Sequence, residues 1–116
     1  MIQHIDVGPR MSEAVVHNGV VYLAGQVSTD GAMEIGGQTR DVLAAIDALL
    51  AKAGTDKSRV LRAQIFLADM ADFPGMNAVW DQWVVPGHTP ARATVQAALA
   101  KPQWRVEIVI TAAVDR

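Results

Sequence analysis

The sequence contains no cysteine, few aromatic residues and no long apolar run, and each absence removes a class of function. Without cysteine the chain has no disulfide, no thiolate nucleophile and no zinc–thiolate site. No apolar run approaches the ~20 residues that a membrane-spanning helix needs. Residues 1–10 also lack the charged-then-apolar pattern of a signal peptide. We therefore expect a cytoplasmic protein with no membrane partner.

An excess of positive charge is absent too. The formal net charge is −2, whereas nucleic-acid-binding proteins usually carry a basic face, so the charge argues against nucleic acid as the main partner. His4, His17 and His88 are widely spaced and match no metal-binding motif, and the chain has no dinucleotide fingerprint, P-loop or metalloprotease helix motif. We expect no metal site.

Periodic apolar patterns are present throughout the 116 residues, which is the usual size of one domain. Asn18 and Gly19 stand between two apolar runs and predict a hairpin with a two-residue turn. A period near 3.6 predicts a helix over 37–53, ended by Gly54, and a second helix over 72–84. Its apolar stripe, which we expect in the core, is Met76, Val79, Trp80 and Trp83.

Three further segments, 59–69, 91–97 and 105–113, are predicted strands. In the first, alternation places Leu61 on the same face as Ala63, Ile65 and Leu67. The order of elements predicts one α+β domain over 1–116, with two helices on one face of a sheet. The other face would expose residues such as Phe66 and Val109, and an exposed apolar face favours a homo-oligomer in which sheets pack together.

Two charges interrupt the last two strands. Arg92 shares a strand face with Thr94 and Gln96, and Glu107 lies within Val106–Ile110. If helices cover the more apolar faces, both charges point away from the helices. A simple hairpin would place Arg92 opposite Glu107; an intervening strand would separate them by about 10 Å. The pair is then either a structural ion pair or an arginine that binds a substrate carboxylate beside an acid that acts on water.

Three segments together resemble the Rid proteins, the reactive intermediate deaminases also called YjgF-type proteins. They are GPRMSEAVVHNGVVYLAGQV, RVLRAQIFLADMADFPGMNAVWDQWV, and TPARATVQAALA followed by RVEI. The resemblance spans nearly the whole chain. It implies a chorismate-mutase-like fold with a mixed sheet, a homotrimer with ligand clefts between subunits, and a strand between those of Arg92 and Glu107. It also implies hydrolysis of enamines and 2-imino acids, such as 2-aminoacrylate, to 2-keto acids and ammonia, without metal or organic cofactor.

The resemblance also assigns residues by motif. Arg92 matches the family's carboxylate-binding arginine, and Glu107 matches the acid that holds the attacking water. Gly25 matches a glycine whose backbone lines the cleft from the neighbouring subunit. Thr94 occupies a pocket position where archetypal members have cysteine. Asn77, in MNAVW, matches an asparagine near the site.

Met11 departs from the family pattern. Archetypal members carry a tyrosine in a GPYS-like segment, where this chain reads GPRMSEA. A thioether cannot donate a hydrogen bond, so the resemblance implies a divergent branch with a more apolar upper wall to the pocket. Two alternatives stay open beside the deaminase: a non-catalytic trimer that binds small carboxylates or regulates a partner enzyme through the same cleft, and an RNA-acting member, which the acidic charge disfavours.

Overall fold

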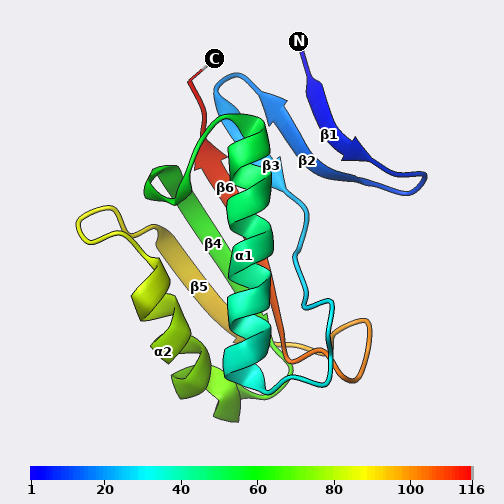
Figure 1. Cartoon of the computed structure of the whole chain (residues 1–116), viewed down its shortest axis with the longest axis vertical. Coiled ribbons are helices and arrows are strands. Elements are labelled where there is room, and N and C mark those ends of the chain that lie inside the picture. Colours follow the sequence, from blue (N-terminus) through cyan, green and yellow to red (C-terminus); the bar gives the residue numbers. More distant parts are fainter. Residues whose placement is uncertain (116) are drawn as a thin grey trace.

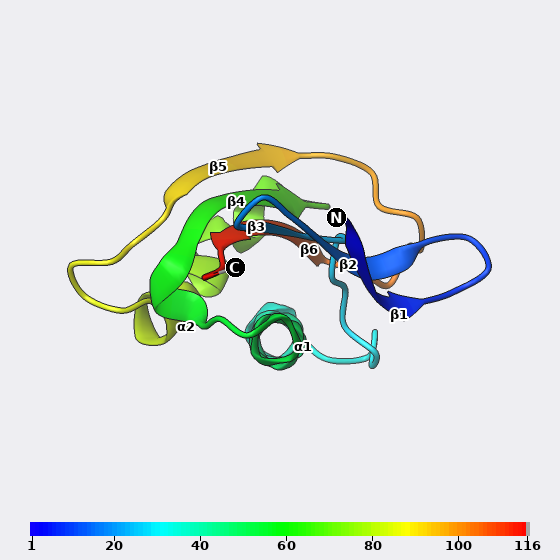
Figure 2. The same cartoon turned by 90° about the horizontal axis from the view of Figure 1, so that it is seen from above.

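The computed structural model describes residues 1–115 and shows a six-stranded mixed sheet with two helices on one face (Figures 1 and 2). Its spatial order is β1-β2-β3-β6-β4-β5, in which only the pair β4 and β5 is parallel. The strands are β1 (Gln3–Val7), β2 (Ser12–His17), β3 (Val20–Leu23), β4 (Val60–Leu67), β5 (Ala91–Gln96) and β6 (Val106–Ala113). This architecture confirms the predicted fold class.

The predicted hairpin is β2 and β3. Asn18 and Gly19 have φ of 50° and 75°, the positive values that a type I′ turn requires. Strand β1 was missed by the sequence interpretation, because only Ile5 of its five residues is buried and so the strand shows no clear alternation. It pairs with β2 at the edge of the sheet.

Helix α1 (Ile35–Ala53) begins two residues before the predicted 37–53 and ends as predicted at Gly54. Gly54 has φ of 86°, in the left-handed region that glycine adopts without strain. Its N–H donates to the carbonyl of Ala51, and the next N–H, of Thr55, donates to Leu50. The apolar stripe of α1 packs on the sheet and forms the core together with α2.

Helix α2 (Phe73–Trp83) lies within the predicted 72–84. Its predicted stripe is confirmed, since the following side chains are buried: Met76, Val79, Trp80 and Trp83. Two short 3-10 helices, η1 (Lys57–Arg59) and η2 (Met70–Asp72), precede β4 and α2. Figure 2 shows α1 and α2 on the same side of the sheet, with the opposite side uncovered.

The predicted face of Leu61 is wrong. The β4–β6 register shifts between Val60 and Arg62, and such an irregularity changes which residues face the core. Val60 is therefore 5% exposed and Leu61 is 50% exposed. From Ala63 onward the predicted alternation holds, because Ala63, Ile65 and Leu67 are all fully buried.

The uncovered face carries mixed side chains. Phe66 and Val109 are half-buried there, as their alternation predicts, while Tyr22 and Val95 are exposed. Leaving such residues uncovered agrees with the expectation of an association surface; the association itself stays a prediction. No helix among residues 1–115 is long and apolar enough to cross a membrane.

Candidate functional site

Arg92 and Glu107 lie on strands that are separated by a third strand. Strand β4 pairs with β5 on one side and with β6 on the other, so of the two arrangements considered from the sequence, the one with an intervening strand is correct. Arg92 is beside Ala63, whereas Glu107 is beside Phe66, three residues further along β4. With strands ~4.8 Å apart and a rise of ~3.3 Å per residue, the two Cα atoms are roughly 14 Å apart.

The two charges also lie on opposite faces of the sheet. Arg92 is in register with Ala63, which is fully buried under the helices, while Glu107 is in register with Phe66 on the uncovered face. The prediction that both charges point away from the helices is thus wrong for Arg92, and equally wrong for Thr94 and Gln96. The two charges cannot form an ion pair within one chain.

The error has a physical cause. In β5 one face is polar and the other is apolar: Arg92, Thr94 and Gln96 against Ala91, Ala93 and Val95. Neither face is fully buried, because β5 is an edge strand with β4 as its one neighbour. The assumption that helices cover the more apolar face therefore selected the wrong face of this strand. The polar face is the covered one because α2 offers polar and aromatic partners there.

Arg92 is held by helix α2. Its Nη1 donates to Asn77 Oδ1 at 2.7 Å, and its guanidinium carbon lies 5.7 Å from the ring centroid of Phe73 and 5.3 Å from that of Trp80. Such distances are those of cation–π contacts. A guanidinium has five N–H donors, and within the described chain Arg92 uses one of them. The remaining donors are free for a planar carboxylate.

Phe73 and Trp80 were not assigned to the site from the sequence. Trp80 was expected only in the core, and Phe73 received no role. A signal was present, because Phe73, Asn77 and Trp80 have the spacing i, i+4, i+7 of one helix face. That face was not matched with Arg92 because the direction of the Arg92 side chain was predicted wrongly.

Thr94 lies on the same face as Arg92, beside Ile65 of β4. Its hydroxyl oxygen is buried and has no hydrogen-bond partner among the described residues. Gln96, the next residue on that face, is already engaged, since its Oε1 accepts the Met70 N–H at 2.7 Å. We call the group formed by Phe73, Asn77, Trp80, Arg92 and Thr94 the arginine site.

Glu107 is positioned by Gly25. A Cβ added to Gly25 would lie 2.3 Å from Glu107 Oε2 and 2.9 Å from its Cδ, so any side chain at position 25 would displace the carboxylate. Gln26 holds the backbone of Gly25 close to β6. The Gln26 N–H donates to the carbonyl of Ile108 at 2.9 Å, and the Ile108 N–H donates to the carbonyl of Gln26 at 3.1 Å. The Glu107 carboxylate makes no hydrogen bond or ion pair within residues 1–115.

Met11 lies in the loop between β1 and β2, is 49% exposed, and accepts the Gly8 N–H through its carbonyl at 2.8 Å. The β2–β3 register continues beyond the strands, as Ala24 N–H donates to the carbonyl of Glu13. Within the strands the pairing of β2 with β3 begins at Ala14, so this register does not place Met11 beside Gly25 or Glu107. We call the group formed by Gly25, Gln26 and Glu107 the glutamate site.

Five of the six residues predicted for the site form two sets. Arg92, Thr94 and Asn77 lie together under the edge of the sheet covered by α2. Gly25 and Glu107 lie together on the uncovered side, and Met11 lies in the β1–β2 loop. Each set is coherent, and a single chain does not bring the two into one cavity.

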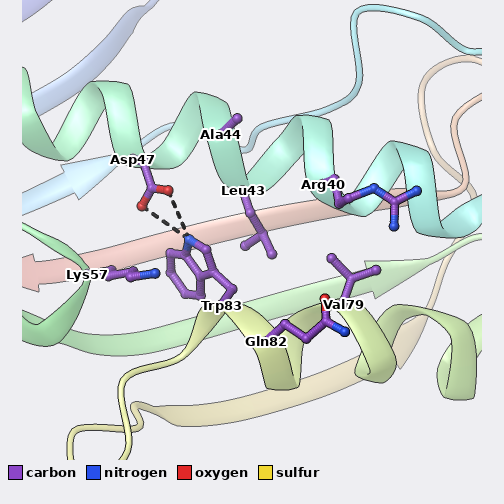
Figure 3. Close-up of a pocket in the computed structure, with 8 residues that line it drawn as sticks. All are labelled: Arg40, Leu43, Ala44, Asp47, Lys57, Val79, Gln82 and Trp83. Carbon is purple, nitrogen blue, oxygen red and sulfur yellow. Dashed lines mark hydrogen bonds between the residues drawn. The ribbon is translucent and has the colours of Figure 1, made fainter.

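A groove of about 240 Å³ lies elsewhere, between α1 and α2 (Figure 3). Trp83 is one of its lining residues, and the indole N–H donates to both carboxylate oxygens of Asp47 at 3.1 Å. Lys57 Nζ lies 5.7 Å from the Trp83 ring centroid. None of the predicted site residues lines this groove, and Asp47 and Lys57 both contact Trp83 within it. We assign it to helix packing.

Comparison with known proteins identifies relatives over the full length. A family model described as "Endoribonuclease L-PSP" matches residues 1–114. A RutC family protein of Haemophilus ducreyi is 53% identical over 115 residues, which cover 99% of this chain and 98% of that protein. The RutC family protein YoaB of Escherichia coli K12 is 50% identical over 113 residues, covering 97% and 98%.

Solved structures agree with this result. NMB1025 of Neisseria meningitidis, a member of the YjgF protein family, matches with a TM-score of 0.96 at 52% identity, covering 100% of this chain and 97% of that chain. A member of the Rid protein family from Yersinia pestis matches with a TM-score of 0.84 at 31% identity, covering 93% and 90%. The chain belongs to the Endoribonuclease L-PSP family, the family of the RutC, YjgF and Rid proteins.

Proposed function

We propose that the protein hydrolyses 2-imino acids and their enamine tautomers to 2-keto acids and ammonia, in clefts between the copies of a homotrimer. The proposal rests on Arg92. Its guanidinium is oriented by contacts with α2 and retains N–H donors that have no partner in the described chain. A carboxylate bound to two such donors would be fixed in the plane of the guanidinium. We also propose that the protein acts in the cytoplasm.

The geometry of the two sites supports an oligomer. A 2-imino acid of three or four carbons is too short to reach from Arg92 to a carboxylate on the other face of the same sheet, roughly 14 Å away by strand spacing. A cleft that contains both groups must therefore combine the arginine site of one copy with the glutamate site of another. The trimer is carried over from the family resemblance.

The chemistry needs few groups, because a protonated imine carbon is already electrophilic. Glu107 accepts a proton from water as the water oxygen bonds to C2, and the C=N π electrons move to nitrogen, which gives a carbinolamine. Glu107 then returns the proton to nitrogen. The C–N bond breaks, ammonia leaves, and the hydroxyl proton passes to the departing ammonia, which gives the keto group and ammonium. Water and iminium are thus converted to 2-keto acid and ammonium, and fixing water and substrate together supplies several kcal/mol of the barrier.

Glu107 distinguishes this proposal from a trimer that only binds carboxylates. A carboxylate in a cleft that binds anions weakens the binding of those anions by repulsion. A protein that only binds carboxylates would therefore gain nothing from Glu107 in its cleft. The Glu107 carboxylate has no partner in the described chain, and Gly25 keeps room for it. An unpaired carboxylate held in place is suited to act as a base on water.

An RNA-cleaving function is suggested only by the family description, which names an endoribonuclease. The net charge of −2 disfavours it. A binding titration with single-stranded RNA at low and high salt provides the check, and a strong affinity that falls with salt would favour the RNA function over ours.

The test uses imino acids generated by an amino-acid oxidase and trapped with semicarbazide. The wild-type protein should compete with trapping, and Arg92→Ala should lose this competition while its oligomeric state is unchanged. Arg59→Ala is the matched control, because Arg59 only pairs with Asp115 at the surface at 2.9 Å. An unchanged rate in Arg92→Ala contradicts the role of Arg92. Absence of competition by the wild type with small, branched and aromatic imino acids contradicts the deaminase.

A further inference from the structure

Gln38 is a polar side chain in the core. It lies in the first turn of α1 and is fully buried. Burying an amide is costly unless its donors and its acceptor have partners. Here they do, since Nε2 donates to the carbonyl of Gln103 at 2.9 Å and Oε1 accepts the Arg105 N–H at 2.8 Å. The carbonyls of Gly31 and Met33 also accept from Nε2, at 3.3 and 3.1 Å.

The partners of the Gln38 amide lie in two loops. One loop, residues 24–34, leads from β3 to α1, and the other, residues 97–105, leads from β5 to β6. The loops are also joined directly, because the Trp104 indole N–H donates to the carbonyl of Ser28 at 3.1 Å. A buried polar network with all its partners specifies one arrangement of the segments that it joins.

Both loops lead to the glutamate site. The first contains Gly25, which leaves room for the Glu107 carboxylate, and the second ends at Arg105, two residues before Glu107. The backbone pair of Gln26 and Ile108 connects the first loop to β6 at this point. A shift of one loop relative to the other would therefore change the space that Gly25 offers to the carboxylate.

The arginine site is held separately. Within residues 1–115, the hydrogen bonds of the Gln38 amide go to the two loops and not to the arginine site. Arg92 is held by Asn77 and by the rings of Phe73 and Trp80, all on α2. Loss of the amide should therefore disturb the glutamate site and leave the arginine site intact.

We infer that Gln38 is a positioning residue, whose buried amide holds the two loops so that the Glu107 carboxylate lies where it can act on water. The inference rests on the proposed function for the role of Glu107. It adds that the position of this carboxylate is set from the helix side of the sheet, by a side chain that makes no hydrogen bond to it.

The first test compares Gln38→Met with Thr39→Val. Methionine is similar in size to glutamine but has no donor and only a weak acceptor. Gln38→Met should lower kcat for imino acids about 10- to 100-fold, because a small displacement of a reacting group is costly. The affinity for pyruvate, a 2-keto acid probe measured by calorimetric titration, should not change. A loss of pyruvate affinity as large as the loss of kcat would overturn the inference.

Thr39→Val is the matched control. Thr39 is also fully buried in α1, and its hydroxyl donates within the helix, to the carbonyl of Ile35 at 2.7 Å. This variant should lower the unfolding temperature and keep kcat, and an equal loss of kcat in both variants would mean that lower stability alone explains it. If Gln38→Met does not fold, Trp104→Phe removes the other link between the loops. It should lower kcat several-fold, and an unchanged kcat would overturn the inference.

A measurement without turnover separates this inference from the deaminase. Carbon-13 labelling of glutamate carboxyls gives signals from Glu13, Glu34 and Glu107 alone, and Glu107→Gln identifies the Glu107 signal. Gln38→Met should shift this signal, and Thr39→Val should not. A wild-type protein that does not compete with semicarbazide contradicts the deaminase, whereas an unshifted Glu107 signal in Gln38→Met contradicts the role of Gln38.

Discussion

The arginine site and the glutamate site are prepared in different ways. Arg92 is held by three contacts from one helix, to Asn77, Phe73 and Trp80. The Glu107 carboxylate has no bonded partner in the described chain and is positioned by the empty space at Gly25. A group that binds benefits from a fixed orientation, whereas a group that accepts a proton must not be neutralised by a permanent partner. The contrast suggests separate tasks, binding for one surface and proton transfer for the other.

The largest effects should come from removing each charge, and they should differ in kind. Arg92→Ala should abolish both turnover and the binding of pyruvate. Glu107→Gln should lower kcat by about 10²–10⁴-fold, the usual contribution of a general base, and should leave pyruvate affinity unchanged or slightly increased. Steady-state kinetics and calorimetry on both variants provide the comparison. A Glu107→Gln protein that loses binding as Arg92→Ala does would contradict the division of tasks.

The next effect concerns Gly25. Gly25→Ala would place its Cβ 2.3 Å from the present position of Glu107 Oε2, so the carboxylate must move. A displacement of about 1 Å in an active site can cost ~10²-fold in rate, and we expect a loss of that order in kcat with little change in pyruvate affinity.

Gly36→Ala is the matched control for Gly25→Ala. A Cβ at Gly36 in α1 would be no closer than 3.5 Å to Arg40, an ordinary contact. Alanine can adopt the helical backbone conformation of Gly36, and such a replacement stabilises the folded protein by about 0.4–1 kcal/mol. This variant should therefore be fully active and slightly more stable. Equal activity of Gly25→Ala and the wild type would show that the Glu107 carboxylate has no required position.

The arginine site is tested by its aromatic contacts. Trp80→Leu removes a ring at 5.3 Å from the guanidinium carbon, and a partly desolvated cation–π contact contributes about 0.5–2 kcal/mol. We expect KM for imino acids to rise several-fold at nearly constant kcat, with partial rescue in Trp80→Phe. Trp83→Leu is the control. Trp83 is also buried in the core, but its indole N–H donates to Asp47 and its ring is not one of those that contact Arg92. It should lower stability without raising KM.

Most of the fold could be predicted from the sequence where a pattern was strong. The Asn18-Gly19 turn, the apolar stripe of α2 and the end of α1 at Gly54 were all correct. Prediction failed where pairing overrides local pattern: β1 has one buried residue, Leu61 stands at a register shift, and β5 turns its polar face toward α2. These are the edge strands and an irregularity, in which hydrophobicity alone does not specify a face.

The same limit applies to the candidate site. The residue types were identified by resemblance, and the structure groups them, but the split into two sets depends on register. A parallel pairing of Arg92 with Ala63 and an antiparallel pairing of Glu107 with Phe66 cannot be read from either strand by itself. Changing the β5 register by one residue would exchange its faces, and Arg92 would lie on the same side as Glu107.

The smallest expected effect concerns the loop that follows the glutamate site. Asp41 of α1 accepts hydrogen bonds from the Ser28 hydroxyl and from the Thr29 N–H, each at 2.8 Å, and these bonds lower the pKa of its carboxyl. Since the folded-state pKa is depressed, this contribution to stability is present at pH values above the unfolded-state pKa. It is lost as the pH falls through the folded-state value, in the acid range below the ordinary 3.8.

Asp41→Asn should therefore destabilise the protein at neutral pH by less than ~1 kcal/mol, because the carboxyl is near solvent and screened. The difference from the wild type should vanish in acid, where Asp41 is protonated. Urea unfolding between pH 7 and pH 3 measures both. Since Ser28 follows Gly25 and Gln26 in the same loop, kcat should fall slightly and pyruvate affinity should not change, which is the pattern expected of the glutamate site. A change confined to affinity would instead connect this loop to the arginine site and remove the distinction between the two surfaces.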